Sequence, residues 1–183
     1  MRSIVVGLSS ALVAVVLAMP APAQASSSKA SDGQDSGTVL DVASVKLQGK
    51  GSTSIVGTIT TFAAFSDDDI AGPNGLGIDF EISKKILRGT SIRVVDGVLG
   101  AEICSYQASG DDPLGSKCHD VKAVRTADNA VQVTIPRKLV AKGMKVYRWR
   151  AGSLAFDGTA GCDGPVCVDS VPNKAATYIA WRF

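Results

Sequence analysis

The chain has 183 residues, of which 45% are hydrophobic and 20% are charged, and its formal net charge at pH 7 is +2. This near-neutral balance argues against nucleic acid and anionic membrane surfaces as partners, because both require a concentrated basic face. The length suits one domain with a single hydrophobic core.

Residues 1–25 have the pattern of a cleaved secretory signal peptide. Arg2 is the only charged residue among them, residues 4–19 are mostly apolar, and small residues suited to cleavage follow, with cleavage expected after Ala25. The apolar run is short for a membrane-spanning helix, and the prolines that follow it break helices. We therefore expect a soluble, secreted, extracellular protein with no stable membrane insertion.

Residues 26–37 form a polar segment that is dominated by small residues. Such a segment buries too little apolar surface to offset the entropy lost on ordering, which predicts a flexible linker. Residues 38–183 are then expected to form a single domain.

Most of this domain has the sequence pattern of β-strands. Residues 52–62 form a Thr-rich alternating run, and residues 78–83 alternate apolar with polar side chains, which indicates a strand with one buried face. The remaining strand candidates are 40–47, 91–99, 101–107, 121–125, 131–135, 145–154 and 175–183. One helical turn is expected at 137–142. About nine short strands predict an all-β fold, an antiparallel β-sandwich, with a closed barrel as the alternative.

Four cysteines follow the predicted signal peptide, and an even number in an exported chain predicts two disulfides. Of the three pairings, we favour Cys104–Cys118 and Cys162–Cys167. Each closes a short segment, rich in Gly, Asp and Pro, of the kind that joins two strands. Zinc is the weaker alternative, because closely spaced cysteine pairs are missing and the sequence contains one histidine.

Three short motifs lie at strand boundaries: the run 41–47, the turn 135–140 (IPRKLV) and the segment 169–173 (DSVPN). Together they resemble small exported β-sandwich proteins of actinobacteria that have no assigned activity. The resemblance implies the same fold, and it transfers no catalytic residues.

The sequence predicts no catalytic residue. The sole histidine, His119, is adjacent to Cys118, and the chain lacks the Gly-x-Ser-x-Gly turn of serine hydrolases. Asp79 and Glu81 share a strand face at a separation that glycoside hydrolysis could use, although two acids on one exposed face are more often plain surface residues. An exported hydrolase is therefore kept as an alternative function.

Three aromatic residues give the best hypothesis for ligand binding. Tyr147 and Trp149 share one face of a predicted strand, and Trp181 lies on the last strand. Such rings could form a platform on which a sugar or an apolar partner stacks, or they could fill the core. Both interpretations are open at the level of sequence.

Calcium is the one cofactor that the sequence suggests. Asp67, Asp68 and Asp69 are followed by Asp79, and carboxylate oxygens are the ligands that calcium prefers. The spacing does not match a helix-loop-helix calcium loop, since Ile78 occupies the place of the required glutamate. A calcium loop of another kind is the hypothesis, against a solvated acidic turn.

These features predict a secreted, non-catalytic binding module for a cell-envelope glycan or for another exported protein. A protease inhibitor is a further alternative to the hydrolase. The segment closed by Cys162 and Cys167 would be its inhibitory loop, since a preorganised loop loses little entropy on binding.

Overall fold

The computed structural model describes residues 26–107, 117–140, 143–173 and 177–182, so the predicted signal peptide lies outside the described residues. Almost all of the regular structure is antiparallel strand. A single 3₁₀ turn, η1 (Asp68–Ile70), and a short helix, α1 (Arg137–Val140), complete the described elements. The strands are β1 (Ser27–Ser31), β2 (Val42–Lys50), β3 (Ser54–Thr61), β4 (Gly75–Ser83), β5 (Ile86–Val95), β6 (Val98–Gln107), β7 (His119–Ala127), β8 (Ala130–Pro136), β9 (Val146–Phe156), β10 (Val166–Val171) and β11 (Ile179–Arg182).

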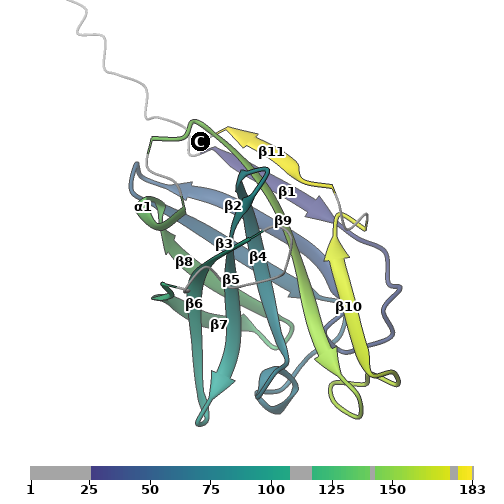
Figure 1. Cartoon of the computed structure of the whole chain (residues 1–183). Helices are drawn as coiled ribbons and strands as arrows, with labels where there is room; N and C mark the ends of the chain where they lie inside the picture. The colour runs from purple at the N-terminus through teal and green to yellow at the C-terminus, as the bar shows by residue number, and fades with distance from the viewer. Residues whose placement is uncertain (1–25, 108–116, 141–142, 174–176, 183) are drawn as a thin grey trace, which may run out of the picture.

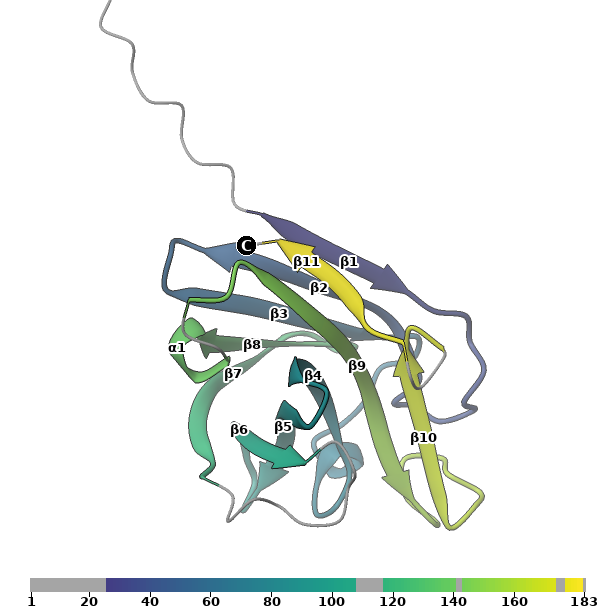
Figure 2. The same ribbon diagram turned by 45° about the horizontal axis from the view of Figure 1, so that its top comes forward.

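The strands form one continuous sheet in the order β1-β2-β3-β8-β7-β6-β5-β4-β9-β10, and β11 also pairs with β9. A short pairing of β6 with β7 joins the two halves of the sheet. The sheet curls around a common interior until β1 and β11 lie side by side (Figures 1 and 2). The predicted antiparallel all-β fold is confirmed, with eleven described strands in place of about nine.

Two ends of the sheet meet along what we call the seam, where β1 and β2 face β9, β10 and β11. Side chains bridge it: the Val42 N–H donates to Asp169 Oδ2 at 2.6 Å, and Trp149 Nε1 donates to Ser28 Oγ at 3.1 Å. A backbone hydrogen bond also joins the two sides of the seam, since the Val39 N–H donates to the Ala160 carbonyl at 3.0 Å. The N-terminal segment is thus attached to the C-terminal part of the domain.

The segment 26–37, for which a flexible linker was expected, contains a strand. Residues 27–31 form β1, which pairs with β2 along its whole length. This strand contributes little to the core, since its side chains are exposed or half-buried. Backbone hydrogen bonds to a neighbouring strand order it, and composition does not report such bonds.

A second difference concerns residues 91–99, which were expected to form one strand. The structure contains a hairpin there, with Val95 paired to Val98 across a two-residue turn. Asp96 and Gly97 both have positive φ, 52° and 74°, as a type I′ turn requires. The Asp-Gly pair is therefore the turn between β5 and β6.

Alternation along each strand fills the interior. In β4 and β9 every second side chain is buried, including Ile78, Phe80 and Trp149. Leu40, Ile55 and other aliphatic residues complete one core. The predicted disulfides are confirmed as Cys104–Cys118 and Cys162–Cys167, and they fit a protein that folds in an oxidising compartment.

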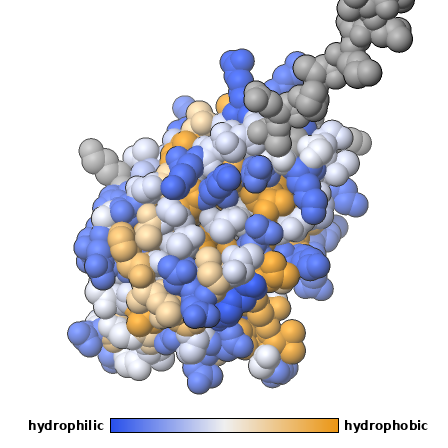
Figure 3. Space-filling model, turned by 180° about the vertical axis from the view of Figure 1, so that it is seen from behind, coloured by the Kyte–Doolittle hydropathy of each residue, from blue (hydrophilic) through white to orange (hydrophobic). Residues whose placement is uncertain are grey.

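The described helices are too short to cross a membrane. Seen from behind, the molecule presents hydrophobic residues in small areas that polar residues interrupt (Figure 3).

Candidate functional site

The three aromatic residues that sequence offered for ligand binding lie in the core. Trp149 is 0% exposed, and Tyr147 and Trp181 are also buried, with 5.9 Å between their ring centroids. Phe80 packs edge-on against Tyr147. The prediction that these rings form a stacking platform is therefore wrong. The alternative interpretation, that they pack in the core, is the one that the structure supports.

The predicted calcium site at Asp67, Asp68, Asp69 and Asp79 is not formed either. Asp67 Oδ1 lies 2.6 Å from Arg125, and Asp69 Oδ2 accepts hydrogen bonds from Ser66. Asp68 is exposed within η1, while Asp79 lies on β4 and is paired with Arg150. The carboxylates engage separate partners and do not converge on one point.

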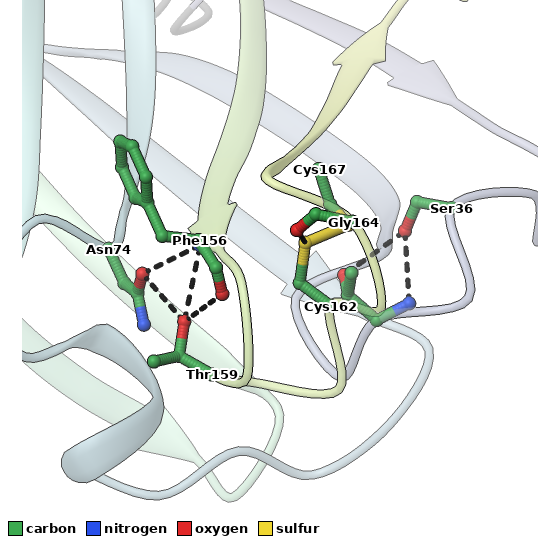
Figure 4. Close-up of a disulfide and its surroundings, with 8 residues drawn as sticks. Ser36, Asn74, Phe156, Thr159, Cys162, Gly164 and Cys167 are labelled. Carbon is green, nitrogen blue, oxygen red and sulfur yellow. Dashed lines mark hydrogen bonds between the residues drawn. A yellow bond between two sulfur atoms is a disulfide. The ribbon is translucent and has the colours of Figure 1, made fainter.

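The loop of the inhibitor hypothesis is fixed at its base (Figure 4). Cys162 is buried, while Asp163 and Pro165 are exposed. Beside the loop, Asn74 Oδ1 accepts hydrogen bonds from the Phe156 N–H and from Thr159 Oγ1, each at 3.1 Å. The disulfide therefore closes a turn that is packed against the start of β4.

A groove crosses the outer face of the sheet over β5, β4, β9 and β10. Its floor is a row of small residues in direct cross-strand register: Ser91, Gly77, Gly152 and Ser170. The groove has a volume of about 380 Å³, which falls within the range of small-ligand sites. Four strands at their usual spacing give it a length of about 14 Å.

Close approach of the strands explains the two glycines. A Cβ on Gly77 would lie 2.6 Å from the Thr90 carbonyl oxygen, and one on Gly152 would lie 2.2 Å from that of Asp169. Side chains are excluded at both positions, so the outer face there is bare backbone. The same residues that permit the tight sheet leave the floor of the groove open.

Two different walls border the floor. On one side, the next cross-strand pair is Asp79 with Arg150, and their side chains form an ion pair at 3.0 Å. On the other side lie Leu154 and Val168, which pair across β9 and β10. One wall is therefore polar and the other apolar.

Tyrosines extend the polar wall. The Tyr106 hydroxyl donates to Asp79 Oδ1, and the ring of Tyr178 lies 5.2 Å from the Arg150 guanidinium carbon. Burial, together with the Asp79 charge, raises the pKa of Tyr106, and burial likewise raises the pKa of Tyr178. Both hydroxyls are therefore protonated at physiological pH and serve as neutral hydrogen-bonding groups.

Arg150 keeps its charge within this wall. Burial acts to lower the pKa of its guanidinium, but Asp79 together with Tyr178 and Tyr106 outweighs that effect and raises it. The two opposite charges compensate each other, so the polar wall offers both donors and acceptors without a net charge.

The acids of the hydrolase alternative are held in ion pairs. Asp79 pairs with Arg150, and Glu81 pairs with Arg148 at 2.8 Å. Glycoside hydrolysis needs one carboxylic acid that can donate a proton to the leaving oxygen. Two arginine-paired carboxylates on one strand do not provide this arrangement.

Comparison with known proteins adds no assignment. The chain matches no protein-family model, no curated protein and no solved structure.

Proposed function

We propose that the protein is a secreted, non-catalytic binding module that holds a cell-envelope glycan in the groove over β5, β4, β9 and β10. The observation that carries this proposal is the row formed by Ser91, Gly77, Gly152 and Ser170, lying between a polar and an apolar wall. Export, expected from the first 25 residues and consistent with the two disulfides, would bring the groove to envelope polysaccharides.

The chemistry of the walls favours a neutral, polyhydroxylated ligand. Sugar hydroxyls both donate and accept hydrogen bonds, and the pair Asp79–Arg150 supplies an acceptor beside a donor. The opposite wall, Leu154 and Val168, suits the C–H face of a sugar ring. A strongly charged ligand would meet compensated charges and gain little from them.

The shape of the groove favours an extended ligand. It runs across the strands and is open to solvent above its glycine floor, so a short oligosaccharide can lie along it without entering the core. Backbone polar groups in the floor are already used within the sheet, which leaves the walls to provide specificity.

Another exported protein is the second candidate partner. Its support is a pair of exposed valines on β10, Val166 at 47% and Val168 at 66% exposure. β10 pairs with a single described neighbour, β9. A strand from a partner protein could therefore pair with β10 and extend the sheet, and the exposed valines would contact that partner.

Retention on insoluble polysaccharide tests the glycan proposal. Residues 26–183 are applied to purified bacterial cell-wall glycan and to a panel of insoluble polysaccharides. The variant Ser91→Tyr fills the groove from β5, while Thr60→Tyr places the same ring on the outer face of β3, far from the groove. We expect the unmodified protein and Thr60→Tyr to be retained, and Ser91→Tyr to bind at least about tenfold more weakly, one tenfold being 1.4 kcal/mol.

Two results would overturn the proposal. One is that the unmodified protein passes through every resin. The other is that Ser91→Tyr is retained as well as Thr60→Tyr, with both variants folded by circular dichroism.

A further inference from the structure

Four carboxylates gather at the seam, where the N-terminal segment meets β10. Oxygens of Asp32, Asp35 and Asp169 lie within 4.8 Å of one another. Asp32 and Asp35 follow β1, whereas Asp169 lies on β10. The cluster therefore joins two ends of the sheet that are far apart in sequence.

Asp41 lies directly beside this cluster and is almost completely buried, at 1% exposure. Its Oδ2 accepts hydrogen bonds from the N–H groups of Asp35 at 3.0 Å and Ser36 at 3.1 Å. The next N–H along the chain, that of Val42, donates to Asp169 Oδ2. Asp41 is thus placed between the loop that carries Asp35 and the strand that carries Asp169.

Two oxygens in this region lack a hydrogen-bond partner although they are buried. They are Asp41 Oδ1 and Asp32 Oδ2. The other oxygen of Asp32 accepts a bond from the Gly33 N–H at 2.7 Å. A buried carboxylate oxygen without a partner is unfavourable, which points to a ligand that is positively charged.

Among the residues that the structure describes, no positively charged side chain forms an ion pair with these carboxylates. In the described parts of the chain, ion pairs involve Asp67, Asp79, Glu81 and Glu102, and none of the seam carboxylates. Asn173 Nδ2, a neutral donor, lies 2.9 Å from Asp35 Oδ2.

We propose that Asp32, Asp35 and Asp169 bind a calcium ion at the seam, with Asp41 as the buried carboxylate beside it. Calcium takes six to eight oxygen ligands at about 2.3–2.6 Å. Two oxygens on opposite sides of one ion are then about 5 Å apart, which agrees with the spacing of the cluster. Water and backbone carbonyls would complete the coordination.

The ion would fasten the N-terminal segment to β10. The segment 26–37 has few apolar side chains to hold it, and the described hydrogen bonds that attach it to the domain include those to β2, to Trp149 and to Asn173. A divalent cation would add bonds from both sides of the seam and would neutralise the mutual repulsion of the carboxylates. The order of β1 would then depend on calcium, independently of any ligand in the groove.

Calcium titration tests this site. Residues 26–183 are stripped with EDTA and titrated with calcium chloride by isothermal calorimetry, while hydrogen exchange follows the amides of 27–31. The variant Asp35→Asn removes one exposed ligand charge, and Asp68→Asn removes a matched exposed charge from η1, in the acidic run that sequence alone suggested.

We expect one calcium ion per chain, slower exchange of residues 27–31 when calcium is bound, and at least about tenfold weaker binding in Asp35→Asn. Asp68→Asn is expected to bind as the unmodified protein does. Absence of saturable binding at millimolar calcium would overturn the proposal. Equal affinity in Asp35→Asn and the unmodified protein, or a loss confined to Asp68→Asn, would overturn it too.

Discussion

Replacing Trp149 with alanine is expected to destabilise the fold instead of removing a ligand contact. The indole is completely buried, and its Nε1 donates to Ser28 Oγ at 3.1 Å. Truncating a buried tryptophan costs about 3–5 kcal/mol. In a domain of this size each kcal/mol lowers Tm by about 2–4 °C, so the expected decrease is on the order of 10 °C.

Thermal unfolding of residues 26–183, followed by circular dichroism, measures this effect. Trp149→Phe keeps most of the ring volume and loses the hydrogen bond, and Ser28→Ala removes only the acceptor. The decrease in Tm should be largest for Trp149→Ala, smaller for Trp149→Phe and smallest for Ser28→Ala. An unchanged Tm in Trp149→Ala, combined with lost retention on polysaccharide, would refute the core assignment and restore the aromatic platform.

Further expectations follow from close contacts and covalent links. Gly152→Ala would place a Cβ 2.2 Å from the Asp169 carbonyl oxygen and is expected to cost about 1–3 kcal/mol or more in denaturant unfolding, whereas Gly100→Ala, with open space around it, should change stability little. Replacing Cys104–Cys118 by two serines, a pair separated by 14 residues, should cost about 3 kcal/mol; Cys162–Cys167, separated by 5, should cost about 2 kcal/mol. Equal free energies of unfolding for the two glycine variants, or a larger loss of stability from the shorter disulfide, would contradict these estimates.

The regular strands could be predicted because their alternation records which face is buried. Residues 78–83 and 131–135 alternate in sequence, and β4 and β8 alternate in burial. The disulfides could also be predicted from the sequence, since each closes a short connection between two strands. β1 could not be predicted from the sequence, because this edge strand forms through backbone hydrogen bonds, which leave no apolar pattern in the sequence.

The functional residues depend on topology, which a single sequence does not contain. Alternation placed Tyr147 and Trp149 on one face of a strand, but it did not determine whether that face points inward. The row of Gly77 and Gly152 exists only once the register of β4 and β9 is fixed. Likewise, Asp169 joins the acidic residues after β1 only because the sheet curls back on itself. The turn between β5 and β6, in contrast, has a local signal in the sequence, the pair Asp96 and Gly97.

Amide chemical shifts of the groove residues report most directly whether the groove binds a glycan. In a ¹⁵N-labelled sample of residues 26–183 titrated with soluble cell-wall glycan fragments, we predict concentration-dependent shifts at Gly77, Gly152 and Ser170. The amide of Gly97, at the tip of the β5–β6 hairpin, should remain unchanged. Shifts confined to that hairpin tip, or no shifts at millimolar glycan, would contradict glycan binding in the groove.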